Sequence, residues 1–261
     1  MKPNIIHYYN GYTLIELLIA MVITLFATLV ITRFFITEHY VYRVQEAKAE
    51  MNQTLRGAMN MFTGELILAG YGIPPSTKKI TKFKTDEIEF RTNLRNIRAA
   101  FSADSPAGET ILSIKGGGKS FEKDDVIVIC NNSNYDICEE HILSKDGGSY
   151  SLTITSGLGT AFPAGSTVNL MNTISYIYNK TKRALQRKID RGYWEPVAEN
   201  VAGDGFSLSY RDKNNNTPLD SSDIRGIDIT LTVEGFRRDS YFQENNGYRR
   251  GSAETSITLR N

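Results

Sequence analysis

The sequence predicts an α+β protein in which a long N-terminal helix packs on an antiparallel β-sheet head. Three observations lead to this prediction. Residues 12–31 form an apolar run, no proline occurs between Tyr12 and Leu68, and short alternating runs separated by glycine or proline turns follow from Lys82 onward. The chain is expected to divide into three parts: a short N-terminal segment at residues 1–11, a helix at residues 12–69 and a β-rich head at residues 76–261.

The first half of the helix is long enough to cross a membrane. Residues 12–31 are twenty residues with one formal charge, Glu16, and a hydrocarbon core of ~30 Å needs about 20 apolar residues as a helix. We expect the transmembrane part to occupy residues 12–35. A carboxylate in such a segment is costly and usually has a function, so Glu16 is a candidate site residue.

The second half of the helix is predicted to be amphipathic. From residue 37 to residue 69, apolar residues recur mostly at intervals of three and four, which places their side chains on one helix face. The stripe consists of Val44, Met51, Leu55, Ala58, Phe62, Leu66 and Ala69. Gly57 and Gly64 suit either a close approach by a neighbouring element or tolerated flexibility. The glycines and prolines of residues 70–75 predict the end of the helix.

The rest of the sequence predicts an antiparallel β region. Turn signals such as Gly147-Gly148 and Pro163-Ala164-Gly165 separate β-prone runs. The expected strands are residues 88–92, 111–114, 126–130, 150–155, 168–178, 184–189, 206–210, 224–233 and 256–259. Residues 168–178 and 184–189 are expected to form a hairpin. The region is long enough for two sub-sheets, divided near Gly165.

Charge and composition limit the classes of partner. The chain has 261 residues, with 30 basic and 29 acidic side chains and a net charge of +1, so the total charge does not favour nucleic acid or an acidic substrate. Hydrophobic residues make up 41% of the chain and aromatic residues 10%, which argues against disorder. We expect neither a nucleic-acid partner nor a small-molecule substrate.

Two cysteines, Cys130 and Cys138, lie close together in the region beyond the apolar run. A translocated domain meets an oxidising compartment, so a local disulfide is the favoured interpretation. The alternative is a pair of metal ligands, with further candidates nearby at Asp136, Glu139, Glu140 and His141. Their spacing matches no zinc pattern.

No motif for catalysis or cofactor binding is found in the sequence. Gly118-Lys119-Ser120 lacks the earlier glycine of a phosphate-binding loop, because Ser113 stands at that position, and it is interpreted as a glycine-rich hairpin turn. The three histidines, His7, His39 and His141, are scattered, and no nucleophile elbow or metalloprotease motif accompanies them. We expect no catalytic residues, no resident metal and no cofactor.

Two polar stretches have alternative interpretations. The loop from Asp212 to Asp223 carries oxygen ligands at alternate positions, which suits calcium, but an Asn-rich solvated hairpin loop is favoured. The second is a basic stretch that consists of Lys180, Lys182, Arg183, Arg187 and Lys188. The pairs Arg237-Arg238 and Arg249-Arg250 add to its positive charge. It could bind DNA or lipid headgroups, but a charged strand edge is favoured.

The start of the apolar run resembles a known signal. Gly11-Tyr12-Thr13-Leu14-Ile15-Glu16, followed by the apolar helix, is similar to the class III signal of type IV pilins and pseudopilins, apart from Tyr12 in place of Phe and a weakly basic leader. The resemblance implies a leader at residues 1–11, cleavage between Gly11 and Tyr12 by prepilin peptidase, and N-methylation of Tyr12. It also implies that Glu16 pairs with the N-terminal amine of a neighbouring subunit. The alternative is a plain single-pass anchor.

A weaker resemblance concerns the rest of the chain. The chain also looks like the PilW-like minor pilins, in residues 66–72, 174–178, 199–201, 206–210 and 225–231. The expected fold is therefore pilin-like. This resemblance implies a minor pilin in the priming or tip complex of a type IV pilus. Its partners would be other minor pilins, the major pilin and the inner membrane, with the head in the periplasm before assembly. The alternatives are a minor pseudopilin of a type II secretion system, or a membrane-anchored periplasmic enzyme or binding protein.

Overall fold

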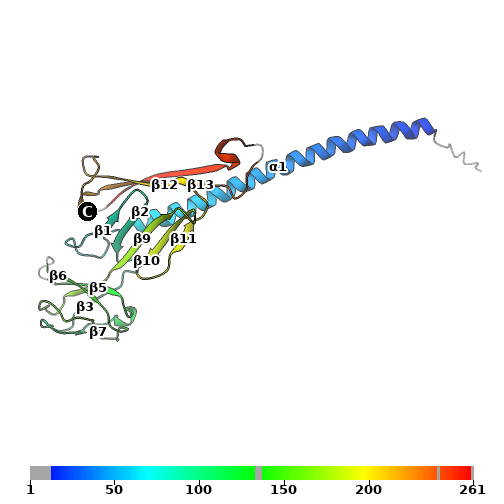
Figure 1. The fold of residues 1–261 in the computed structure, drawn as a ribbon. Helices are drawn as coiled ribbons and strands as arrows, with labels where there is room; N and C mark the ends of the chain where they lie inside the picture. Colours follow the sequence, from blue (N-terminus) through cyan, green and yellow to red (C-terminus); the bar gives the residue numbers. More distant parts are fainter. Residues whose placement is uncertain (1–12, 133–136, 240–241, 260–261) are drawn as a thin grey trace, which may run out of the picture. The chain divides into compact units, whose positions relative to one another are not determined.

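The computed structural model describes residues 13–132, 137–239 and 242–259 (Figure 1). The long helix α1 covers Leu14–Leu66 and holds 53 residues. The chain divides into two compact units, Met1–Glu50 and Met51–Asn261. The predicted α+β fold is confirmed, because α1 is followed by antiparallel strands against which its C-terminal part packs.

Within the first unit, α1 is apolar on all sides between Glu16 and Arg33. The side chains of residues 13–39 are exposed, and the helix is long and apolar enough to cross a membrane. A helix that is hydrophobic all round is stable only where the surroundings are apolar as well. The first unit therefore has the properties of a membrane anchor.

Three threonines lie inside this apolar surface without leaving a hydroxyl unpaired. Thr24, Thr28 and Thr32 donate their hydroxyls to the carbonyl oxygens four residues earlier, each at 2.7 Å. An unpaired hydroxyl in hydrocarbon would cost on the order of several kcal/mol. Because the backbone accepts these hydroxyls, the stretch between Glu16 and Arg33 can keep them at little cost.

The second unit begins with the C-terminal part of α1, which packs through one face. Its buried residues are Met51, Leu55, Ala58, Met59, Phe62 and Leu66. This confirms the predicted stripe from Met51 to Leu66 and adds Met59. After Leu66 the chain forms turns over residues 67–72. Gly70 and Gly72 have φ of 84° and 71°, a left-handed conformation that favours glycine.

The two glycines within α1 do not mark a close approach inside this chain. A Cβ atom added at Gly57 or at Gly64 would meet no neighbouring heavy atom within 4 Å. The helix face that carries them is open in the head. Of the two interpretations of these glycines, close approach by an element of this chain is not what the structure shows, because the sheets pack on the face that carries Leu55 and Phe62.

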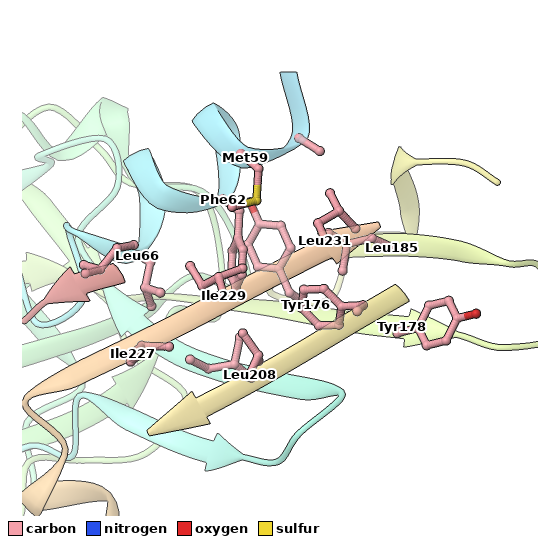
Figure 2. Packing of buried hydrophobic residues seen from close by; sticks show 14 of the residues in the cluster. Met59, Phe62, Leu66, Tyr176, Tyr178, Leu185, Leu208, Ile227, Ile229 and Leu231 are labelled. Atoms are coloured by element: carbon pink, nitrogen blue, oxygen red, sulfur yellow. The ribbon is translucent and has the colours of Figure 1, made fainter. Parts of the chain in front are cut away.

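Two antiparallel sheets share a core with this part of α1. The first has the order β1-β2-β9-β10-β11 and the second the order β12-β13-β14. Their strands are β1 (Ile80–Phe83), β2 (Glu87–Thr92), β9 (Asn172–Asn179), β10 (Ala184–Ile189), β11 (Glu195–Ala198), β12 (Val201–Arg211), β13 (Gly226–Glu234) and β14 (Arg250–Thr258). In the core, the rings of Phe62 on α1 and Tyr176 on β9 lie 4.4 Å apart (Figure 2). Ile229 and Leu231 of β13 lie beside them.

A β-rich insertion with its own core lies between β2 and β9. It contains the sheet β3-β8-β5-β6 and the pair β4-β7. Its strands are β3 (Arg98–Ala100), β4 (Ile111–Ser113), β5 (Val126–Cys130), β6 (Cys138–Ile142), β7 (Ser151–Thr153) and β8 (Thr167–Leu170). Phe101, Phe121 and Phe162 are fully buried among its aliphatic residues. Short 3₁₀ turns, η1 (Gly118–Ser120) in the insertion and η2 (Ser221–Asp223) and η3 (Glu244–Gly247) elsewhere in the head, complete the described elements.

The expected single strand at residues 168–178 is wrong. The chain divides at Met171 into β8, which pairs with β3 and β5, and β9, which pairs with β2 and β10. The Met171 amide donates to the Val126 carbonyl at 2.9 Å. The two cores are thus separated at Met171, whereas the division was expected near Gly165. A continuous run of β-prone residues does not reveal that its two halves have different partners.

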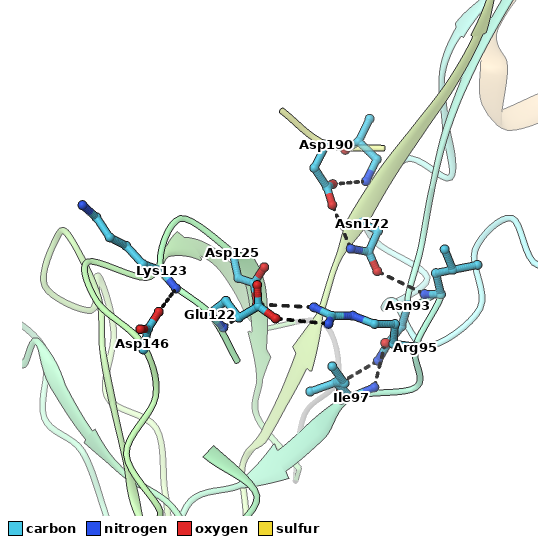
Figure 3. Close-up of polar contacts among 11 residues, drawn as sticks. Asn93, Arg95, Ile97, Glu122, Lys123, Asp125, Asp146, Asn172 and Asp190 are labelled. Carbon is cyan, nitrogen blue, oxygen red and sulfur yellow. Dashed lines mark hydrogen bonds and ion pairs between the residues drawn. The ribbon is translucent and has the colours of Figure 1, made fainter. Parts of the chain in front are cut away.

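Buried amides join the insertion to the first sheet (Figure 3). The Asn93 side chain donates to the Ile97 carbonyl and accepts from the Ile97 amide, at 2.8 and 2.9 Å. The side-chain oxygen of Asn172, Oδ1, accepts from the Leu94 backbone amide, and its side-chain nitrogen, Nδ2, donates to the Asp190 carboxylate at 2.8 Å. The chain leaves the first sheet for the insertion at Asn93 and returns to it at Asn172. The side chains at both points have their hydrogen bonds satisfied, which fixes where the insertion leaves and re-enters the sheet.

A buried ion pair joins α1 to the first sheet. Glu65 accepts from both Arg187 Nε, at 2.9 Å, and Arg187 Nη2. The Tyr176 hydroxyl donates to the same carboxylate at 2.7 Å. The Glu65 and Arg187 side chains are each only 13% exposed. Burial and the hydrogen bond to Glu65 both raise the pKa of Tyr176, so its hydroxyl stays protonated as a donor.

The first testable prediction concerns this ion pair. Glu65→Ala should lower the free energy of unfolding of the head by ~3–5 kcal/mol, because Arg187 would stay buried without a counter-charge. Chemical denaturation followed by the fluorescence of Trp194, the chain's one tryptophan, measures this loss. Glu122→Ala is the control, since Glu122 and its partner Arg95 are 67% and 48% exposed and should contribute less than ~1 kcal/mol. Equal losses in the two variants would contradict the role of Glu65.

Candidate functional site

The candidate site is the start of α1, where the sequence predicts cleavage, methylation and an assembly contact. Gly11 and Tyr12 lie outside the described residues. Thr13 and Glu16 are described, and α1 begins between them at Leu14. The predicted site residue Glu16 therefore sits in the first turn of the helix, at its positive end, where a carboxylate is favourable.

Thr13 and Glu16 form a capping box. The Thr13 hydroxyl accepts from the Glu16 amide at 3.3 Å, and Glu16 Oε2 accepts from the Thr13 amide at 3.4 Å. The first amides of a helix have no partner within the helix, so a Thr and a Glu three residues apart can satisfy two of them reciprocally. Glu16 thus has a structural role within its own chain, which the sequence analysis missed although Thr13 and Glu16 carry the required spacing.

The geometry leaves the Glu16 carboxylate available to a second partner. Its contact with the Thr13 amide is longer than the 2.7–3.2 Å typical of strong N–H···O hydrogen bonds. The Glu16 side chain is exposed, and the following residues up to Thr32 carry no charge. The site therefore presents one anion, in contact with Thr13, at the edge of an apolar surface.

The predicted disulfide is present in the head. Cys130 and Cys138 are bonded, and they face each other across the β5–β6 pair. Together with Val128, both cysteines form a small apolar cluster with Met171 and Ile73, the latter from the segment after α1. The bridge therefore closes the β5–β6 loop and packs where the insertion meets that segment.

The metal-ligand alternative for the cysteines is not supported by the contacts around them. Asp136 lies outside the described residues. Glu139 accepts from the Gly159 amide and the Thr160 hydroxyl, each at 2.8 Å, and lies 2.9 Å from His141 Nε2. Burial opposes ionisation of Glu139, but these hydrogen bonds outweigh it and hold its pKa below the ordinary value. Glu139 therefore anchors the loop at Gly159.

His141 belongs to the same network. Its side chain is 6% exposed, and its second ring nitrogen, Nδ1, lies 3.4 Å from the Ser156 hydroxyl. The row Ser156–His141–Glu139 has the residue types of a hydrolase triad. However, the carboxylate is already shared with two donors of the 159–160 loop, and the Ser156–His141 contact is long. The row is best explained as a polar tie between β6 and that loop.

The Asp-rich loop is organised by its own backbone. Asp212 Oδ1 accepts from the amides of Asn214 and Asn216, at 2.7 and 2.8 Å, and Asp220 accepts from the Ser222 amide at 2.9 Å. These are the local turns that Asp side chains favour. Among the described residues, no group of three or more His, Cys, Asp or Glu side chains is placed to hold a metal ion.

The interpretation of the basic stretch as a charged strand edge is wrong. Arg187 and Lys188 lie on β10, which has β9 on one side and β11 on the other. Three of the five cations are matched by acids of the head: Arg187 pairs with Glu65, Arg183 with Glu234 and Lys180 with Asp86. Sequence alone did not show these acidic partners, because they are distant along the chain.

The glycines near Lys119 form a turn, but not the predicted hairpin turn, because β4 before them pairs with β7 and β5 after them pairs with β6 and β8. Gly118–Ser120 is a 3₁₀ turn that leads through further turns into β5. A Cβ atom on Gly118 would lie 2.0 Å from the Gly148 carbonyl oxygen, so the glycine is required for close packing of two backbones. Packing against Gly148 thus explains a pattern that partly imitates a phosphate-binding loop.

Comparison with known proteins identifies the N-terminal site. Residues 6–32 match the family model of the prokaryotic N-terminal methylation motif. The chain matches no curated protein. The motif indicates a type IV pilin-like protein that is processed by prepilin peptidase and works in a pilus or membrane context. It points to a structural protein rather than an enzyme, and with the apolar part of α1 it fits a membrane-anchored chain whose globular domain lies outside the membrane helix.

The second testable prediction concerns the capping box. Thr13→Ala should weaken the first turn of α1 by ~1 kcal/mol, because the Glu16 amide loses the Thr13 hydroxyl and keeps only its contact with the Thr13 carbonyl at 3.1 Å. Hydrogen exchange of the amides of residues 15–17, measured on the full chain in detergent micelles, should then be on the order of fivefold faster. Thr24→Ala is the matched control, because its hydroxyl bonds only to the Ala20 carbonyl. Unchanged exchange in Thr13→Ala would show that the box does not hold the helix start.

Proposed function

We propose that this chain is a minor pilin, of the PilW-like kind, that takes part in the priming or tip complex of a type IV pilus. The observation that carries the proposal is the placement of Glu16 at the fifth position of the apolar run, counted from Tyr12, which directly follows Gly11. The methylation-motif match over residues 6–32 supports it. So does a β-rich head with two separate cores, which offers a large surface for contacts with other subunits.

Processing comes first in the proposed sequence of events. Prepilin peptidase removes residues 1–11 by cleavage between Gly11 and Tyr12, and the new amine of Tyr12 is methylated. Before assembly the chain lies in the inner membrane: residues 12–35 span the membrane, and residues 76–261 lie in the periplasm. Assembly then moves the apolar part of α1 from the lipid into the core of the filament.

Glu16 supplies the selectivity of that transfer. In the membrane its carboxylate lies near the interface and is held by two long contacts, to the amide and the hydroxyl of Thr13, at 3.4 and 3.5 Å. In a filament it would meet the methylated amine of Tyr12 from a neighbouring subunit. Opposite charges in an apolar environment attract strongly, and either one alone carries a desolvation cost of several kcal/mol. The pair therefore favours the assembled state over the free subunit.

Thr13 prepares Glu16 for that partner. Its cap keeps the carboxylate beside the Thr13 amide through a long contact of 3.4 Å, so the side chain is already partly oriented when the amine arrives. A net contribution of about 1 kcal/mol is typical of a capping contact, which is less than a buried ion pair gains over an uncompensated charge. The neighbouring amine can thus displace the cap without a large opposing cost.

The third testable prediction concerns assembly. Glu16→Ala should reach the membrane and be cleaved normally. Its recovery in sheared pili should fall by a factor on the order of several hundred, because the amine of the neighbour would be left without a counter-charge, at ~3–5 kcal/mol. Glu38→Ala is the matched control: it removes the same carboxylate from the same helix, outside the uncharged stretch.

Three other outcomes decide against the proposal. Equal recovery of Glu16→Ala and wild type, at equal membrane level, would mean that Glu16 is not an assembly contact. Recovery of the wild-type chain with the pseudopilus of a type II secretion system instead of pili would assign it to the pseudopilins. Absence of the wild-type chain from both assemblies would favour a membrane-anchored periplasmic enzyme or binding protein.

A further inference from the structure

The last strand of the head leaves one long edge without a partner. β14 pairs with β13 along all nine of its residues, from Arg250 to Thr258. On its other side, no strand of the described residues pairs with it. An unpaired edge presents a row of N–H and C=O groups that can accept another strand.

The direction of these groups follows from the bonds at the two ends of the β13–β14 pair. The Leu259 amide donates to the Arg225 carbonyl, and the Gly235 amide donates to the Arg249 carbonyl, each at 2.8 Å. In an antiparallel pair the residues that face the partner alternate, so the odd-numbered residues of β14 face β13. The backbone groups of Ser252, Glu254 and Ser256 therefore point outward. We call this row the β14 edge.

The other edges of the two main sheets are protected. β11 has four residues and contains Pro196, and β1 has four residues, with a shift of register between Ile80 and Lys82. The edge of β12 is partly covered, because the Leu208 amide donates to the Thr85 carbonyl at 2.8 Å. Prolines, short strands, irregular registers and coverage are the devices by which native proteins block strand addition.

The β14 edge has none of these four devices, although its strand carries two charged side chains, Arg250 and Glu254. Its strand is nine residues long, contains no proline and keeps one register with β13 throughout. Its side chains between Arg250 and Ile257 are small apart from Glu254, so they leave the backbone accessible. A long regular edge with small side chains is the arrangement that accepts an added strand.

We propose that the β14 edge is completed by an extended strand from a different pilin-type subunit, one that carries Lys or Arg opposite Glu254. This inference rests on the proposed function, which supplies the neighbouring subunits. Glu254 is exposed and makes no ion pair with another described residue. A directly opposite cation would satisfy it across the new strand pair.

A second copy of the same strand fits this edge less well. The only cation on β14 is Arg250, and its guanidinium already contacts Glu234 at 2.7 and 2.9 Å and Asp204 at 3.6 Å. Glu234 is only 9% exposed, so moving Arg250 away would take one of the two arginines that contact this buried carboxylate and leave it only Arg183. An antiparallel copy of β14 would therefore offer Glu254 no available cation.

The experiment uses the full chain in its native membranes and compares two substitutions at one position. Ser252→Pro removes an outward N–H that makes no bond within the head, whereas Ser252→Ala keeps it. Recovery of the chain with the other pilin-type subunits, extracted together in mild detergent, should fall about tenfold or more for Ser252→Pro and stay near wild type for Ser252→Ala. Glu254→Lys, which leaves the backbone unchanged, should also reduce recovery.

Crosslinking identifies the occupant. A photoreactive amino acid placed at Ser252 or at Ser256 should attach to one strand of another subunit, with the two attachment points shifted by about four residues along it. Crosslinks to a second copy of this chain, scattered attachment points, or equal recovery of Ser252→Pro and Ser252→Ala would each overturn the proposal. If the wild-type chain is recovered with no pilin-type subunit, the proposed function fails, and not this edge alone.

Discussion

The whole structure depends on one helix that has to be stable in two different environments. From Leu17 to Thr32 every exposed side chain must suit an apolar surround, and the threonines meet this demand by bonding to the backbone. From Met51 onward the same helix must instead bury one face against sheets, and it does so through Phe62 and its neighbours. The change from an all-round apolar surface to a one-sided one lets a single element act as an anchor and as part of a globular core.

Two glutamates on this helix illustrate how position decides the role of a charge. Glu65 is buried, and it is fully matched by Arg187 and Tyr176, so it fixes the helix on the first sheet. Glu16 is exposed and only weakly held by the cap with Thr13. A carboxylate that is satisfied inside its own chain contributes to folding, whereas one left partly unsatisfied beside an apolar surface favours a contact with another molecule. This contrast is the physical basis for assigning Glu16, and not Glu65, to assembly.

The sequence predicted the features that depend on local pattern. The apolar run, the stripe from Met51 to Leu66, the strands around Val126 and Ala184, and the disulfide all follow from periodicity, residue type or compartment. What it did not predict depends on partners far along the chain. Met171 divides a continuous β-prone run because its two sides pair with different strands. Arg187 is matched by an acid on the helix, which no local signal announces. The capping box at Thr13 is the exception, because its signal was local and was overlooked beside the stronger signal of Glu16.

The N-terminus of the purified mature protein tests the central claim most directly. If α1 is a pilin-type helix, intact-mass and N-terminal peptide analysis should find a chain that begins with N-methyl-Tyr12. The Gly11→Ala variant should remain largely unprocessed, because the signal that this chain resembles ends its leader in glycine and the added methyl group would stand at the cleavage site. A mature chain that retains residues 1–11, or one that is cut after the apolar run at Ile31, would contradict the account, since Glu16 would then have no adjacent amine of this kind to pair with.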